Sequence, residues 1–256
     1  DAEGYTFMGW STKPMQSVSP QYEAEEKITV NGNVDLYAVV FNRTTETDLT
    51  EDQLPQVDIY KYKQVIFVGD SRTEFMENVL TGMGESATKN VKFVCSAGKG
   101  LDWFTTTGWA QLYSIVQHDS NSILSKKTAV IFNFGVNDLS KSADYAEYYN
   151  WIAPQLKSKG CELYFMSVNP VNRLMLPNAG RADRSEAAVR SFNQYMKANL
   201  SSAYTYIDMY SYLKSTGYSF ASDHYGTGTV DDGLHYTTRT YKRIFAKCMD
   251  SLRVPA

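Results

Sequence analysis

The stretch Val65-Ile66-Phe67-Val68-Gly69-Asp70-Ser71-Arg72-Thr73 runs from four apolar residues straight into Gly-Asp-Ser. A short, unbroken apolar run that ends in glycine is typical of a strand buried on both faces, as in parallel sheets. The carboxyl edge of an open α/β sheet is where its chemistry lies. Ser71 is therefore a candidate nucleophile, provided that other segments supply a base, an orienting acid and oxyanion donors.

From about residue 60 onward, apolar strands alternate with helical patterns, which predicts a parallel sheet with crossover helices. The expected strands span residues 65–69, 91–95, 129–134, 163–168 and 204–207. Helices are expected around residues 75–80, 109–117, 145–156, 189–200 and 241–252, the last with the clearest helical period. Thr237 is the expected N-cap of that last helix. Asp183-Arg184-Ser185-Glu186 has the spacing of a capping box that opens the helix expected around residues 189–200.

Residues 1–41 differ in character and predict a small all-β module. Strands are expected over 4–11, 27–30 and 34–40, the last two joined by a tight turn at Asn31-Gly32. The module resembles part of a Listeria–Bacteroides repeat (internalin B type) of bacterial surface proteins. The matching residues are Gly4-Tyr5-Thr6-Phe7, Gly9-Trp10-Ser11, Tyr22, Ile28-Thr29-Val30 and Leu36-Tyr37-Ala38. Only the later half of a repeat is present, and Val40 or Phe41 stands where the family often has Trp.

Composition limits the remaining possibilities. Residues 42–59 are polar and acidic with little periodicity, and we interpret them as a linker to a domain over residues 60–256. The formal net charge of −3 gives no electrostatic case for binding nucleic acid or an anionic membrane surface. No apolar run approaches the roughly 20 residues of a membrane span. Because the chain opens in mid-module, we expect its true N-terminus to lie upstream. Three cysteines, Cys95, Cys161 and Cys248, predict buried free thiols rather than disulfides or a metal site.

The chain has three histidines, and one of them has an acid at a useful spacing. His118 falls at a helix end and His224 in a polar loop, where ordinary structural roles are the simpler interpretation. His235 follows Asp232 by three residues in a turn that contains Gly233. A carboxylate at that spacing can bind the imidazole Nδ1 and leave Nε2 facing outward.

Two further segments follow the ends of expected strands. Ser96-Ala97-Gly98-Lys99-Gly100 comes after the second strand, and Gly135-Val136-Asn137-Asp138 comes after the third. Glycine lets backbone N–H groups approach a ligand, and an asparagine amide can donate to an oxyanion. Each motif alone marks a turn more often than a site, but together they occur in the order Ser, Gly, Asn, Asp/His.

This combination resembles the SGNH (GDSL-type) hydrolase family over residues 60–256. The resemblance implies Ser71 as nucleophile, Asp232 as orienting acid and His235 as general base. It implies an oxyanion hole made by the N–H groups of Ser71 and Gly98 and the side chain of Asn137. The implied fold is a flavodoxin-like three-layer α/β/α sandwich with a five-stranded parallel sheet in strand order 2-1-3-4-5. The family needs no metal or organic cofactor.

Two positions depart from the family pattern. Arg72 stands where Leu is usual, so it either steers an anionic substrate or pairs with a nearby acid such as Asp70 or Asp232, and we favour the pairing. Gly100 competes with Gly98 as the oxyanion donor, and Gly98 fits the family pattern better. Asp70 and the Asp138 of the asparagine motif are assigned structural roles.

The sequence therefore predicts a bacterial extracellular or cell-surface serine esterase that removes O-acetyl groups from polysaccharide. Alternatives are acetyl transfer onto cell-wall glycan, cleavage of acyl lipids, and a non-catalytic surface adhesin or glycan-binding protein. Two segments, 169–181 and 218–230, are expected to roof the cleft. The substrate-binding candidates are Arg72, Arg173, Arg181, Tyr218, His224 and Tyr225. The N-terminal repeat is expected to contact neighbouring repeats or the cell surface.

Overall fold

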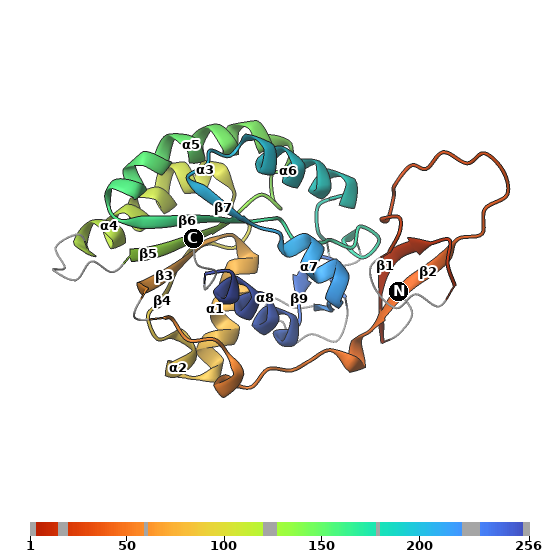
Figure 1. Ribbon diagram of the computed structural model, residues 1–256, viewed down its shortest axis with the longest axis horizontal. Helices are drawn as coiled ribbons and strands as arrows, with labels where there is room; N and C mark the ends of the chain where they lie inside the picture. Colours follow the sequence, from red (N-terminus) through yellow and green to blue (C-terminus); the bar gives the residue numbers. More distant parts are fainter. Residues whose placement is uncertain are drawn as a thin grey trace.

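A parallel sheet of five strands lies at the centre of the computed structural model, which describes residues 4–14, 20–58, 61–119, 127–177, 180–221 and 231–252. The strands are β3 (Tyr62–Gly69), β4 (Val91–Cys95), β5 (Lys127–Asn133), β6 (Cys161–Met166) and β7 (Tyr204–Ile207). They lie in the order β4-β3-β5-β6-β7 (Figure 1). In chain order this is 2-1-3-4-5, so the predicted fold is confirmed.

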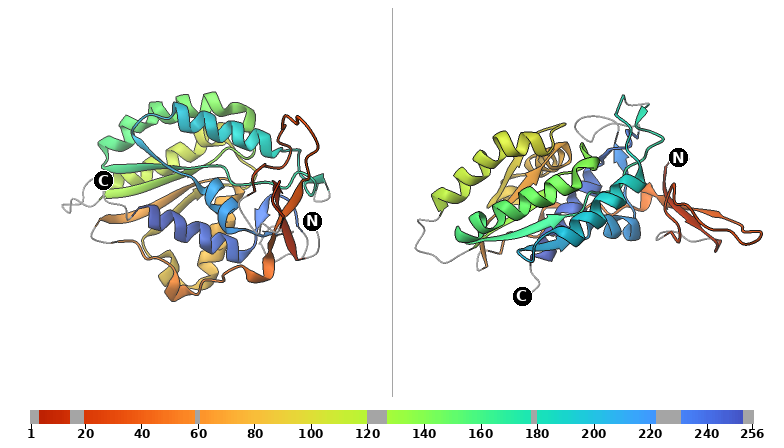
Figure 2. Two further views of the ribbon diagram at one scale, coloured as in Figure 1. Left: turned by 45° about the vertical axis from the view of Figure 1, so that its right-hand side comes forward. Right: turned by 90° about the horizontal axis from the view of Figure 1, so that it is seen from above.

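Helices cover both faces of this sheet. Alternate residues of β3 face opposite ways: Val65 and Phe67 pack with α1 (Ser71–Met83) and α8 (Thr238–Ser251), whereas Ile66 and Val68 pack in the core under the other helix layer. That second layer is formed by α4 (Trp109–Asp119), α5 (Ser142–Ser158) and α6 (Glu186–Asn199) (Figures 1 and 2). The result is the expected three-layer sandwich.

Shorter elements complete the connections: α2 (Glu85–Thr88), α3 (Leu101–Trp103), a π-helical turn (Phe104–Gly108), a 3₁₀ turn η4 (Leu139–Lys141), α7 (Met209–Thr216), and the two-stranded pair β8 (Phe220–Ala221) and β9 (His235–Tyr236). None of the helices in the described residues is both long and apolar enough to cross a membrane.

One of the two predicted helix caps is correct. Thr237 caps α8, because its side chain accepts a hydrogen bond from the backbone N–H of Thr240. The capping box at Asp183 is wrong: α6 begins later, and its N-cap is Ser185, which accepts from the N–H of Ala188 at 3.0 Å. The Asp183 carboxylate instead binds Arg173, with N–O distances of 2.6 and 2.7 Å.

The N-terminal sheet consists of two antiparallel strands, β1 (Tyr5–Ser11) and β2 (Tyr37–Asn42). The predicted strand over residues 27–30 and its hairpin across Asn31-Gly32 are wrong, because β2 pairs with β1 instead. Residues 20–36 project from the molecule (Figure 1), and Val30, Val34 and Leu36 are between 41 and 51% exposed. An alternating pattern forms a strand only where one of its faces is covered.

This small sheet packs on the rest of the molecule. Met8, Val39 and Phe41 are buried and belong to the same hydrophobic core as Leu213 of α7 and Tyr218. The Lys214 ammonium, also buried, binds the Met8 carbonyl and pairs with Glu23 at 2.9 Å. The views in Figure 2 show the sheet against this end of the body.

The segment predicted as a linker contacts the sandwich along α8. Residues 43–58, called the strap below, contain two 3₁₀ turns, η1 (Arg43–Thr45) and η2 (Glu51–Gln53). The buried carboxylate of Glu46 binds Arg243 at 3.1 Å and the hydroxyl of Thr240. Leu54 and Val57 of the strap lie in the core beneath α1 and α8.

Candidate active site

Ser71 is the first residue of α1, directly beyond the end of β3. The turn is set by Asp70, the N-cap, whose side chain accepts a hydrogen bond from the Arg72 N–H at 3.0 Å. Ser71 opens into a pocket of about 380 Å³ lined by Ser71, Ala97, Gly98, Asn137, Gly180, Arg181, Ala182, Arg184, Leu234 and His235. The carboxyl edge of the sheet thus carries a pocket with a serine at its base.

The histidine and acid reach this serine from the segment before α8. The Nε2 atom of His235 lies 2.9 Å from the Ser71 Oγ, and its Nδ1 lies 2.7 Å from Oδ2 of Asp232. The other carboxylate oxygen of Asp232 accepts the N–H groups of Leu234 and His235, at 2.9 and 2.7 Å. The side chains of Ser71, Asp232 and His235 are all buried, and the centre of the Phe75 ring lies 4.3 Å from that of the imidazole. The turn therefore holds the carboxylate rigidly behind the imidazole.

Gly98, rather than Gly100, lies at the pocket. Gly98 lines it with a φ of +70°, and a β-carbon there would meet no atom within 4 Å. Gly100 instead approaches Asp138 so closely that a β-carbon would lie 2.3 Å from its carboxylate. That carboxylate accepts the Leu101 N–H at 2.9 Å and the Tyr145 hydroxyl at 2.7 Å, so Asp138 ties two loops together.

Asn137 is held in one orientation by a residue that the sequence patterns did not single out. Its Oδ1 accepts a hydrogen bond from Nη2 of Arg184 at 2.9 Å, and its Nδ2 donates to the Lys99 carbonyl at 2.8 Å. Arg184 also donates to the carbonyls of Val136 (2.6 Å) and Ala182 (2.8 Å). The amide oxygen is thereby tied to Arg184, and Nδ2 keeps a second hydrogen beside the pocket.

Comparison with known proteins adds the family to this geometry. The family described as GDSL-like Lipase/Acylhydrolase matches residues 65–248, which include every pocket residue named above. The chain belongs to the GDSL-like lipase/acylhydrolase family. It is therefore a serine esterase, and the SGNH resemblance drawn from the sequence is confirmed at the level of the family.

The chain is also similar to solved structures. A protein from Slackia heliotrinireducens described as an SGNH hydrolase has a TM-score of 0.51 at 12% identity, over 75% of this chain and 100% of its own. A Bacteroides fragilis protein described as an acylhydrolase gives 0.49 at 16% identity, over 79% and 93%. The acetyl xylan esterase AlAXEase gives 0.48 at 11% identity, over 75% and 100%. No curated protein sequence matches the chain significantly.

Burial governs the protonation of the histidine–acid pair in this GDSL-like site. Burial lowers the pKa of His235 below its usual 6.5, and the positive charges of Arg72 and Arg181 lower it further, against the opposing effect of Asp232. Burial raises the pKa of Asp232, but the hydrogen bonds from His235 outweigh it and hold that pKa below 3.8. At pH 7 the imidazole is neutral and the carboxylate ionised, as a general base requires.

Arg72 does not have the partner that we expected. Its guanidinium is buried and donates to three backbone carbonyls, those of Leu234 (2.9 Å), Asn169 (2.8 Å) and Pro170 (2.7 Å). The predicted pairing with Asp70 or Asp232 is therefore wrong, because backbone carbonyls of the loops accept the hydrogen bonds of the guanidinium. Arg72 does not line the pocket either, which removes it as a substrate contact.

The other substrate-binding candidates divide by position. Arg181 lines the pocket, whereas Arg173 and Tyr218 do not. Arg173 pairs with Asp183, and with Glu25 at 3.5 Å, and Tyr218 is buried in the core beside the N-terminal sheet. His224 and Tyr225 lie outside the described residues, and the side chain of His118 is not described.

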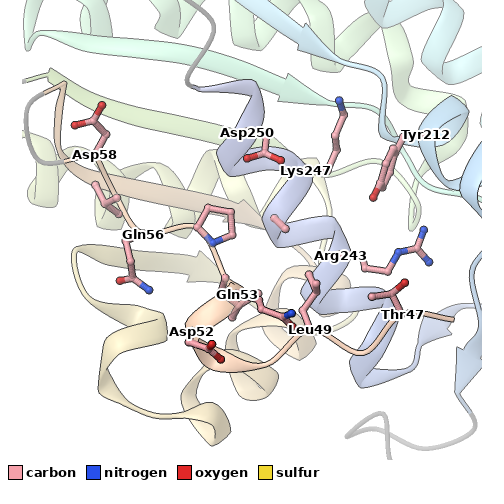
Figure 3. A pocket seen from close by; sticks show the side chains of 14 residues that line it. Thr47, Leu49, Asp52, Gln53, Gln56, Asp58, Tyr212, Arg243, Lys247 and Asp250 are labelled. Atoms are coloured by element: carbon pink, nitrogen blue, oxygen red, sulfur yellow. The ribbon is translucent and has the colours of Figure 1, made fainter.

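A larger groove of about 1060 Å³ lies between the strap and α8 (Figure 3). Charged side chains such as Asp52, Arg243, Lys247 and Asp250 line it together with apolar strap residues. Its described lining includes no serine, cysteine or histidine, so it has no nucleophile–base pair. The smaller pocket at Ser71 is the one equipped for ester chemistry.

Proposed function

We propose that this esterase removes O-acetyl groups from extracellular polysaccharide, with Ser71, His235 and Asp232 as its catalytic triad. The observation that carries the proposal is the continuous hydrogen-bonded chain from the Ser71 Oγ through both imidazole nitrogens to the Asp232 carboxylate. A serine needs such a base and orienter, because its hydroxyl is a weak nucleophile at neutral pH.

The proposed reaction has two steps. His235 takes the hydroxyl proton while the Ser71 Oγ attacks the acetyl carbonyl, and the resulting imidazolium is stabilised by Asp232. The bond between the acetyl carbon and the sugar oxygen then breaks as His235 gives the proton to that oxygen, so that the sugar leaves as an alcohol and an acetyl-serine remains. Water, deprotonated by His235, resolves that intermediate to acetate and restores the serine hydroxyl.

The oxyanion of each tetrahedral intermediate needs donors that are already in place. The candidates are the N–H groups of Ser71 and Gly98 and the second hydrogen of the Asn137 Nδ2. Gly98 and Asn137 line the same pocket as Ser71, from the loops that follow β4 and β5. The bond from Arg184 to Oδ1 favours the amide orientation in which Nδ2, rather than the oxygen, is available to the oxyanion.

A short acyl group and an extracellular glycan fit the remaining observations best. The pocket is small, and Asn137, Arg181 and Arg184 give it a polar lining, which suits an acetyl group on a sugar better than a long acyl chain. The proposed location of the protein, outside the bacterial cell or at its surface, rests on the resemblance of residues 4–40 to a surface-protein repeat. The binding role of that repeat is part of the same proposal.

The test is Ser71→Ala, with acetate release from acetylated xylan, mannan and peptidoglycan and the hydrolysis of p-nitrophenyl acetate as readouts. Removing the nucleophile is expected to lower kcat on the order of 10⁴-fold or more. Ser215→Ala, an exposed helical serine, serves as the matched control and should keep the parent rate. A Ser71→Ala protein that still cleaves p-nitrophenyl acetate at the parent rate would refute the triad, and transfer of acetyl to added glycan without free acetate would make the chain a transferase.

A further inference from the structure

The charged side chains that line the catalytic pocket are all basic. Apart from His235, the charged lining residues are Arg181 and Arg184, and no described lining residue carries a carboxylate. The acid of the proposed triad, Asp232, is fully buried behind His235 and does not line the pocket. An anionic group on the substrate would therefore meet two guanidinium groups beside the reacting serine.

The two arginines differ in how many of their donors are in use. Nε, Nη1 and Nη2 of Arg184 each donate to a protein oxygen, so Arg184 holds the loop and Asn137 in place. Among the described residues, the side chain of Arg181 has one polar contact, between Nη2 and Oδ2 of Asp232 at 3.3 Å, and it is 23% exposed. Its Nε is buried and has no hydrogen-bond partner in the part of the chain that the structure describes. Arg181 is thus the lining cation with donors to spare.

The fold holds the backbone at Arg181 in place. The Arg181 N–H donates to the Leu176 carbonyl at 2.8 Å. On either side of it, Arg173 binds Asp183 and Arg184 binds Val136. The contact with Asp232 is also the weaker one for that oxygen, which accepts the His235 Nδ1–H at 2.7 Å. An anchored backbone keeps the Arg181 guanidinium, with its unused donors, at the wall of the pocket.

We propose that Arg181 binds a carboxylate that the sugar carries beside the ester, so that the preferred substrate is an O-acetylated acidic sugar such as a uronate. The planar guanidinium fork matches a carboxylate in geometry and charge. Arg181 and Ser71 line one pocket at the small end of the range for ligand sites, which brings the carboxylate and the ester within a single sugar unit. This inference rests on the esterase function proposed above.

A purely positioning role for Arg181 makes a different prediction. Because Arg181 contacts Asp232, it would then act through the triad and affect every ester by the same factor. A carboxylate-binding role changes the ratio of rates between acidic and neutral esters. The ratio, rather than the rate on any one substrate, therefore separates the two roles.

The experiment compares a mono-O-acetylated methyl glucuronoside with its uncharged methyl ester, which differ only at the carboxylate. The parent protein is expected to favour the free carboxylate in kcat/KM on the order of 10- to 100-fold, mainly through KM. Arg181→Gln should bring the ratio close to one, and Arg181→Lys should restore part of it. Arg173→Gln is the matched control, since Arg173 lies on the same loop outside the pocket, and it should keep the parent ratio.

Three results would overturn the inference. The first is a ratio of kcat/KM between the acidic and the neutral ester near one in the parent protein, and the second is an equal fall in kcat/KM for both esters in Arg181→Gln. The third is a preference seen only for p-nitrophenyl hemisuccinate over p-nitrophenyl acetate, which would place the carboxylate on the acyl group. Cleavage of p-nitrophenyl acetate that depends on Ser71 shows in the same experiment that the esterase function stands. Without that cleavage, the proposed function itself fails.

Discussion

Asp70 stands directly before the proposed nucleophile and is buried with one unsatisfied oxygen. Its Oδ1 caps α1 by accepting the Arg72 N–H, whereas its Oδ2 has no hydrogen-bond partner among the described residues. Burial, with a contribution from the negative charge of Asp138, raises the pKa of Asp70 to about 6, despite the opposing charges of Arg72 and Arg184. The folded protein therefore binds a proton here that the unfolded chain has already lost.

The sign of the resulting pH dependence is determined by this order of pKa values. Between the usual 3.8 and about 6, the folded state holds more protons than the unfolded state, so this residue makes the free energy of unfolding fall as pH rises. The span corresponds to about 3 kcal/mol. Asp70→Asn keeps a good N-cap but cannot titrate. The free energy of unfolding should be measured by denaturant for both proteins at pH 4 and pH 7. Between the two pH values, the variant is expected to become more stable relative to the parent protein by about that amount. Parallel stability curves for the two proteins would contradict the prediction.

At the scale of elements, Arg72 joins three segments that surround the proposed triad. It projects from the first turn of α1 and binds the carbonyls of Asn169 and Pro170, which follow β6, and of Leu234, which precedes His235. The Tyr236 ring lies 5.1 Å from its guanidinium carbon. One side chain thereby sets the spacing between the serine helix and the histidine turn.

Arg72→Lys keeps the positive charge but cannot reach three carbonyls in fork geometry. The loss of those bonds in a buried place is expected to lower the free energy of unfolding by about 3 kcal/mol and to lower kcat on p-nitrophenyl acetate, because His235 loses its fixed distance from Ser71. Arg239→Lys, at an exposed arginine of α8, should leave both within error. If Arg72→Lys kept the stability and rate of the parent protein, the positive charge at this position would be sufficient and the three guanidinium hydrogen bonds would not be needed.

The sheet could be predicted because its strands are buried on both faces and their apolar runs stop at turn residues. The five predicted strands lie within two or three residues of β3, β4, β5, β6 and β7 at each end. The short helix α7 and the pair β8–β9 were not predicted, because elements of so few residues carry too little periodicity. The hairpin around Asn31-Gly32 failed for the opposite reason: its pattern was clear, but no other surface covers it.

The meeting of Ser71, His235 and Asp232 was implied by the resemblance to the SGNH family, whereas sequence spacing alone predicted only the contact between Asp232 and His235. The arginines could not be placed in this way. The long side chains of Arg72, Arg181 and Arg184 reach partners that lie 47 to 162 residues away in the chain, so their roles depend on how the loops fold. Sequence spacing holds no information about such contacts.

At the scale of the molecule, the N-terminal sheet and the sandwich share one hydrophobic core. The Phe41 ring lies over the end of α7, so close to Gly217 that a β-carbon there would come within 2.1 Å of it. Phe41 is 7% exposed, whereas its neighbour on β2, Val40, is 37% exposed. The two residues face opposite sides of one strand, which makes them a matched pair for testing whether the sheet unfolds with the enzyme.

Phe41→Ala is expected to lower the free energy of unfolding by about 3 kcal/mol, because it leaves a cavity between β2 and α7. Val40→Ala should change it by less than about 0.5 kcal/mol. If the core is shared, far-ultraviolet circular dichroism and p-nitrophenyl acetate hydrolysis should lose their signals together in denaturant, and Phe41→Ala should shift both midpoints equally. A Phe41→Ala protein whose activity midpoint stays at the parent value would show that the sheet unfolds independently. Cooperative unfolding would instead mean that residues 43–58 join parts of one folding unit, so that trimming the chain to the GDSL-like domain exposes Leu213 and Tyr218 and costs the esterase stability.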